Sequence, residues 1–353
     1  MDQSHVDLQY RFFMVGNRPF ALWDFDIRAR TQEFLNSIDP HYFEYVADAH
    51  LSVLKEPPED DEQAPKHAAT SLRLGYGQAM ETFFGLLCAL LQAPRCIPAW
   101  MALYRTSELH TLVDCIAQSK PFPSQLKWPR PSWNAVADFV LTWLVLEDKS
   151  KKEDIKKGLA QLWRRFASDF LDQGSSDEYN SIKHGLRIRP GGFHFAIGVE
   201  ETPGTTAPPE KMQLLGKSDF GSSYFVPQSI GVRPWHLQLA RHARNWAPED
   251  FAWGLHLVSL SIANLVSAAK IINETPADDV RFHWPSDLSV LSEPWKRLPS
   301  VGITSIKGPT NTIPPELIEP FTRDQIRARY RAGEDAAVRR VKLRQPDGPP
   351  PSS

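Results

Sequence analysis

AATSLRLGYGQAMETFFGLLCALLQ, residues 68–92, indicates the fold class more clearly than any other part of the chain. Its apolar residues recur at intervals of three and four, as they do on one face of an α-helix. Pro94 follows directly and cannot continue a helix. The pattern therefore predicts a long helix with a broad apolar face, formed by Leu72, Tyr76, Ala79, Met80, Phe83, Phe84, Leu87, Leu90 and Leu91.

Other segments repeat this helical spacing on both sides of residues 68–92. Ser132 can cap the first turn of one of them, and Gly174-Ser175-Ser176 is expected to end another. Pro121–Pro131 contains four prolines and is predicted to be a loop. The further predicted helices are Pro40–Leu54, Pro98–Ser119, Ser132 to about Leu146, and Lys149 to about Phe170.

The segment Phe251–Ala269 contains no Asp, Glu, Lys or Arg and approaches the length of a membrane span. It also contains His256, Asn264 and several serines, and its bulky residues follow one helical stripe. Pro248 precedes it, with two acids in the first turn, which suits the start of a helix. The polar interruptions favour a helix buried in a protein core over a membrane-spanning helix. No integral membrane segment is expected.

Short segments show the alternating pattern of β-strands instead. Two of them, near the N-terminus, flank the turn Asn17-Arg18-Pro19. Two others flank Pro190-Gly191-Gly192, and this arrangement predicts a hairpin. The predicted strands are Phe12–Val15, Phe20–Trp23, Leu186–Arg189 and Phe193–Ile197.

Together these elements predict a mainly α protein, a helical bundle with a small antiparallel β hairpin or sheet inserted in it. Helical character is expected to return at about His236, and the acidic stretch Glu56–Glu62 is a candidate boundary. The predicted division is 1–62, a mixed N-terminal segment; 63–185, the helical bundle; 186–230, the β insertion; 231–275, long helices that complete the bundle; and 276–353, an irregular region with a basic C-terminal helix, Arg323–Lys342, and a tail.

Composition sets the outer bounds on function. The chain has 353 residues, 42% of them hydrophobic and 23% charged, which is typical of a globular protein. The net charge of −2 and a pI near 6.6 give no global signal for nucleic acid or for a membrane surface. The three cysteines lack the spacing of a zinc site and are expected to be reduced, which favours a cytoplasmic protein.

YNSIKHGLRIRPGG, residues 179–192, gathers more chemically useful side chains than any other window. The imidazole of His184 can exchange a proton at neutral pH, and the guanidinium groups of Arg187 and Arg189 can hold a phosphate. Asn180 lies four residues before His184, so both are expected on one face of a helix. Such a set suits RNA cleavage without a metal ion, in which the 2′-hydroxyl attacks the adjacent phosphate. No metal and no cofactor are predicted.

The pattern Asn180-x-x-x-His184, near the end of a helix in a helical bundle, resembles the signature of HEPN domains. These domains are helical bundles found in many prokaryotic toxins, defence nucleases and their partners. The family has an arginine at the position where this chain has Tyr179. The resemblance implies either a binding or scaffold protein, which engages RNA, a nucleotide or a protein partner, or a metal-independent ribonuclease of the toxin or defence type. A homodimer is compatible with both.

In both hypotheses the same region carries the function. Asn180 and His184 are the candidate catalytic residues, and the candidate ligand-binding residues are Tyr179, Lys183, Arg187 and Arg189.

A plainer interpretation stays open beside these hypotheses. His184 suits the C-terminal end of a helix, and Gly185 suits the left-handed residue that follows one. The arginines at 187 and 189 alternate with apolar residues, as on the solvent-facing side of an edge strand. Glu81, on the helix of residues 68–92, is expected to pair with Arg73 or Lys183.

Overall fold

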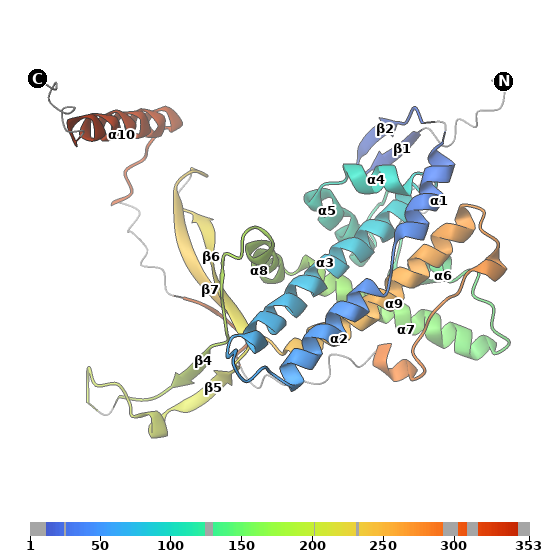
Figure 1. Ribbon diagram of the computed structural model, residues 1–353, viewed down its shortest axis with the longest axis horizontal. Helices are drawn as coiled ribbons and strands as arrows, with labels where there is room; N and C mark the ends of the chain where they lie inside the picture. The colour runs from blue at the N-terminus through green and yellow to red at the C-terminus, as the bar shows by residue number, and fades with distance from the viewer. Residues whose placement is uncertain are drawn as a thin grey trace, which may run out of the picture. The chain divides into compact units, whose positions relative to one another are not determined.

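The computed structural model describes residues 12–24, 26–123, 130–200, 202–230, 233–291, 303–308 and 317–344, with side chains in the last range as far as residue 335. Within these residues the protein is mainly α-helical with small antiparallel sheets, as the sequence predicts (Figure 1). Most of the predicted loop 121–131, parts of the irregular region 276–320 and the tail 348–353 lie outside the described residues.

The long predicted helices are present, and their bounds differ mainly at the ends. Ser132 caps its helix as expected, with Ala135 N donating to Ser132 Oγ at 3.3 Å, but that helix ends at Val140. The helices are α1 Ile27–Ser37, α2 Tyr42–Lys55, α3 Ala64–Gln92, α4 Ile97–Leu103, α5 Thr106–Ala117, α6 Trp133–Val140, α7 Lys149–Leu171, α8 Gln173–Lys183, α9 Pro248–Ile272 and α10 Arg323–Arg344.

The strands form three small sheets. The N-terminal hairpin β1–β2 is confirmed, and Gly16, with a φ of +60°, lies in its turn. A second sheet has the order β3-β6-β7-β8, and a third pairs β4 with β5. The bounds are β1 Phe12–Val15, β2 Arg18–Ala21, β3 Ile188–Pro190, β4 His194–Ile197, β5 Gln213–Lys217, β6 Gly221–Ser229, β7 Leu237–Asn245 and β8 Ser305–Lys307.

Helices α3 and α9 form the centre of the core and pack against each other and against α2 (Figure 1). Gly254 allows the close approach, because a Cβ there would lie 2.5 Å from Cε2 of Tyr76. Among the described residues, α3 and α9 are long and apolar enough to cross a membrane by length and composition alone. However, 78% and 67% of their most apolar windows are buried inside the protein, which is the burial that a core helix requires.

The single helix predicted for Pro98–Ser119 is wrong, because the chain divides there into α4 and α5. Tyr104 and Arg105 have extended backbone conformations between them. Arg18, on β2, stabilises the break: its Nη2 donates to Leu103 O and to Glu108 Oε2, both at 2.8 Å. Glu108 also accepts from Arg105 N at 3.0 Å, so the first turn of α5 is capped by a side chain.

The helix break predicted at Gly174-Ser175-Ser176 is present, but it lies at Asp172, and these three residues form part of the first turn of α8. Asp172 separates the two helices: it follows α7 and caps α8. Its carboxylate accepts from Ser175 N at 2.7 Å. An N-cap of this kind offsets the weak helix propensity of glycine and serine.

The hairpin predicted across Pro190-Gly191-Gly192 is wrong. Strand β3 pairs with β6, with Pro190 opposite Ser222, and β4 pairs with β5. Gly191 has a φ of +112°, so the chain does turn there, but it turns into a different sheet. A turn signal fixes the local backbone, whereas the pairing partner depends on contacts distant in the sequence.

Helical character does not return at His236, because β7 is a strand that continues to Asn245. The residues of β7 include Leu, Gln, Ala and Arg, which favour helices in isolation. Pairing between β6 and β8 overrides that local preference.

The chain divides into two compact units, and β6 and β7 contribute residues to both. The larger unit consists of Met1–Tyr224 and His242–Ile306, and the smaller of Phe225–Arg241 and Lys307–Ser353. In the smaller unit, Trp235 Nε1 donates to Phe321 O at 3.0 Å.

Candidate functional site

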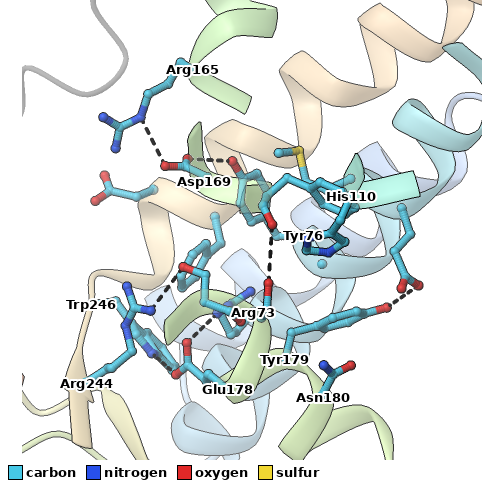
Figure 2. Close-up of a pocket in the computed structure, with 18 of the residues that line it drawn as sticks. Arg73, Tyr76, His110, Arg165, Asp169, Glu178, Tyr179, Asn180, Arg244 and Trp246 are labelled. Atoms are coloured by element: carbon cyan, nitrogen blue, oxygen red, sulfur yellow. Dashed lines mark hydrogen bonds and ion pairs between the residues drawn. The ribbon is translucent and has the colours of Figure 1, made fainter. Parts of the chain in front are cut away.

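A pocket of about 200 Å³ lies in the larger unit, between α3, α5, α7, α8 and the junction of β7 with α9. Figure 2 shows Tyr179 and Asn180 at one end of this pocket and Arg165 and Asp169 at the other. Its walls combine aromatic rings with charged and amide groups. Its lining residues include Arg73, Tyr76, Glu81, His110, Arg165, Asp169, Glu178, Tyr179, Asn180, Arg244, Trp246, Asp250 and Phe251.

A buried ion pair forms the inner wall. Arg73 Nε, on α3, lies 2.8 Å from Glu178 Oε2, on α8, and their side chains are only 5% and 1% exposed. Glu178 also accepts hydrogen bonds from Trp246 Nε1 at 2.9 Å and from the Ser222 hydroxyl. Burial alone would raise the pKa of Glu178, but Arg73 and these hydrogen bonds lower it below the ordinary value. The carboxylate is therefore charged, and both of its oxygens are bonded to groups within the wall.

A second group links α3 to α7. Tyr76 donates its hydroxyl hydrogen to Asp169 Oδ2 at 3.1 Å, and Arg165 Nε lies 3.2 Å from Asp169 Oδ1. Burial raises the pKa of Asp169, and Arg165 opposes that shift. Burial, and then the charge of Asp169, raise the pKa of Tyr76, which keeps this phenol neutral.

Tyr179, one of the predicted ligand-binding residues, packs on α3. Its hydroxyl donates to Glu81 Oε2 at 2.9 Å, and a Cβ on Gly77 would lie 2.3 Å from its ring. Lys183 Nζ lies 2.7 Å from the same Glu81 oxygen. Of the two partners predicted for Glu81, Lys183 is therefore the one that pairs with it. Arg73, the other predicted partner, pairs with Glu178 instead.

Arg244, at the end of β7, forms a further ion pair at the pocket. Its Nη1 lies 2.9 Å from Asp172 Oδ2 and 3.1 Å from Ser175 Oγ. Arg73, Arg165 and Arg244 therefore each face a carboxylate partner.

Two other polar side chains of the pocket, Asn180 and Asp250, make no such contacts within the described residues. In the part of the chain that the structure describes, the amide of Asn180 and the carboxylate of Asp250 form neither hydrogen bonds nor ion pairs. Burial, and then the charge of Glu249, raise the pKa of Asp250 to about 6. His110 stacks against Phe170 at 4.4 Å between ring centroids, and burial lowers its pKa. These groups are the ones free to meet a ligand.

The structure separates the predicted site residues into two sets. Tyr179 and Asn180 line the pocket, whereas Lys183, His184, Arg187 and Arg189 are exposed and do not line it. Arg187 remains close to the first set, with Nη2 3.4 Å from Asn180 O.

The plainer interpretation of the helix end is confirmed. His184 is the C-cap of α8 and its N–H donates to Asn180 O at 3.1 Å. Gly185 follows with a φ of +104°, which glycine adopts at little cost. The imidazole of His184 has no hydrogen bond or ion pair within the described residues.

The sequence patterns gave no reason to single out Glu178, Asp169, Arg244 or Asp250. Glu178 directly precedes the motif, but its partner Arg73 lies 105 positions away. By its sequence position alone, Asp250 is an ordinary acid in the first turn of a helix. The only sequence evidence that Asp250 lines a pocket is partial: the large aromatic residues Trp246 and Phe251 lie on both sides of it.

Comparisons with protein-family models, with curated proteins and with solved structures find no match to this chain. The resemblance to HEPN domains thus rests on Asn180-x-x-x-His184 and on the helical bundle alone, and it stays a prediction. Among the described residues, no group of three or more His, Cys, Asp or Glu side chains is placed to hold a metal ion.

Proposed function

We propose that this chain is a cytoplasmic, HEPN-like binding or scaffold protein that engages a nucleotide, free or within single-stranded RNA. The observation that carries the proposal is the position of Asn180. Its amide lines the pocket and has no partner among the described residues, while the guanidinium of Arg187 contacts its backbone carbonyl at 3.4 Å. A group that can read a base and a cation that can hold a phosphate therefore lie next to each other.

The surroundings of Asn180 suit the two halves of a nucleotide. The pocket offers the rings of Tyr76, Trp246 and Phe251, and proteins commonly stack single-stranded bases on such rings. Outside it, Arg187 and Arg189 are exposed and available to phosphate oxygens. In this arrangement the base enters the pocket and the phosphate stays at the surface.

The alternative is a metal-independent ribonuclease of the toxin or defence type that uses His184. One observation favours it. The exposed imidazole lies one helical turn after Asn180, and the guanidinium of Arg187 lies close to Asn180. A cation there supplies part of the charge that the family arginine provides, since position 179 is a tyrosine bound to Glu81. His184 would then accept the proton of the 2′-hydroxyl as its oxygen attacks the adjacent phosphate, and the 5′-oxygen of the next nucleotide would leave and take up a proton from solvent.

Binding is tested with the purified full-length protein and fluorescently labelled single-stranded RNA, by fluorescence anisotropy over a range of salt concentrations. We expect the Asn180→Ala and Arg187→Ala variants to bind more weakly than the wild type. Loss of one phosphate contact should also lower the slope of log K against log salt by about 0.7 in Arg187→Ala. Lys151→Ala, which removes an exposed cation from α7, is the matched control and should bind normally.

Incubation of the same protein with labelled total RNA in EDTA distinguishes the two functions. Binding without cleavage supports the binding protein. Cleavage that is lost in His184→Ala, and kept in the exposed control His67→Ala, supports the ribonuclease. Absence of both binding and cleavage rejects the two proposals together.

A further inference from the structure

Among the residues that the structure describes, the charges of the pocket leave the carboxylate of Asp250 without a partner. Each arginine that lines the pocket lies close to a carboxylate oxygen: Arg73 at 2.8 Å, Arg165 at 3.2 Å and Arg244 at 2.9 Å. Glu81 is held by Lys183 at 2.7 Å. Asp250, at the start of α9, has no hydrogen bond or ion pair for its side chain within the described ranges.

This charge pattern limits what the pocket can hold. A phosphate would meet the unpaired negative charge of Asp250, while the arginines that might attract it are already paired. A cation would pair with Asp250 but would leave the amide of Asn180 and the aromatic walls without a contact. A neutral ligand that presents N–H donors meets no repulsion from Asp250 and supplies the hydrogen bonds that a half-buried carboxylate lacks.

The walls indicate a flat ligand. Trp246 and Phe251, on either side of Asp250 in the sequence, pack edge to face with centroids 5.3 Å apart, and Tyr76 lies beside Phe251 at 5.4 Å. The unpaired amide of Asn180 adds two donors and one acceptor from α8. A planar base can therefore contact aromatic rings with its faces and polar groups with its edges.

We propose that the pocket selects guanine, whose N1–H and 2-amino N–H donate together to the carboxylate of Asp250, while Asn180 bonds another edge of the base. This inference deepens the proposed nucleotide binding and rests on it. Guanine is the base that places two adjacent N–H donors opposite one carboxylate. Adenine and cytosine present an acceptor beside their amino group, and uracil presents a single N–H between two carbonyls.

The test uses short labelled oligouridines that carry one guanosine, one adenosine or no substitution at a central position. We expect the wild type to bind the guanosine oligomer about tenfold more tightly than the others, as one bidentate contact allows. Asp250→Asn should lose this preference and bind the guanosine and adenosine oligomers equally. Glu249→Gln removes the same charge from the neighbouring, exposed residue and should keep the preference.

The outcomes separate this inference from the function on which it rests. RNA binding without base preference, or a preference unchanged in Asp250→Asn, overturns the guanine site and leaves nucleotide binding intact. If no oligomer binds, RNA binding fails, and calorimetric titration with guanosine then decides whether the pocket takes the base alone. Tighter binding of methylguanidinium than of guanosine overturns the inference in favour of a cation site.

Discussion

Arg73 and Glu178 form a buried ion pair across the pocket wall, with Arg73 Nε 2.8 Å from Glu178 Oε2. The same carboxylate also accepts from Trp246 and Ser222, so one side chain joins α3, α8, β6 and the segment before α9. Because these elements carry most of the pocket, the pair supports its shape. A buried charge that loses its partner is costly, and this makes the pair a sensitive point.

Removing one partner of this pair should destabilise the protein strongly. We expect Glu178→Ala to lower the free energy of unfolding by about 3–5 kcal/mol, because Arg73 would be left buried and unpaired. Urea denaturation measures the change. Glu153→Ala, which breaks the exposed pair with Lys156, should cost less than about 1 kcal/mol. Equal losses in the two variants would contradict a structural role for the buried pair.

Gly77 should be needed for the position of Tyr179. A Cβ at residue 77 would lie 2.3 Å from Cδ2 of the Tyr179 ring, so Gly77→Ala must displace the ring and break its hydrogen bond to Glu81. We expect a loss of about 1–3 kcal/mol in unfolding free energy. In a Tyr179→Ala background the same change should cost almost nothing, because the clash is gone. A double-mutant cycle measures this coupling, and additive effects would contradict it.

Asp250 should make the stability of the protein depend on pH. Its folded pKa is raised from 3.8 to about 6, so the unfolded chain loses this proton first as the pH rises. Folded stability therefore falls between pH 3.8 and about 6, and stays reduced above that range. We expect Asp250→Asn to have a higher Tm than the wild type at pH 7, with a difference that shrinks toward pH 4. A difference independent of pH would show that the carboxylate is not the cause.

The side chain of Asp172 should contribute more to stability than its exposure suggests, because it caps α8 and also binds Arg244. Asp172→Ala removes both contacts, and we expect it to cost about 1–2 kcal/mol. Asp172→Asn keeps a capping oxygen and loses only the charge, so its cost should be clearly smaller. Thermal unfolding monitored by circular dichroism compares the two variants. Equal costs would show that the cap contributes little.

The sequence predicted the elements whose signal is local. The apolar stripe of residues 68–92 became α3, the segment Phe251–Ala269 became α9, and α8 ends at Lys183 with His184 as its C-cap, as the following glycine indicates. In each case one helix face or one backbone conformation carries the information.

The missed elements depend on partners that are distant in the chain. Strand β7 contains helix-favouring residues and is extended because it lies between β6 and β8. The partner of β3 was also missed, since a turn at Gly191 does not identify the strand that follows. For the same reason the motif located Tyr179 and Asn180 at the pocket, but not Asp169 or Asp250, which only the folded chain brings to it.

Three consecutive residues of α8 have separate structural roles. Glu178 is enclosed by Arg73, Ser222 and Trp246, and Tyr179 is fixed against Gly77 and Glu81. The amide of Asn180 supports neither contact and has no hydrogen bond within the described residues. A substitution at position 180 therefore changes the surface of the pocket without loosening the helix that presents it. Under the proposed function, single mutations there would change the ligand preference while the framework stays constant.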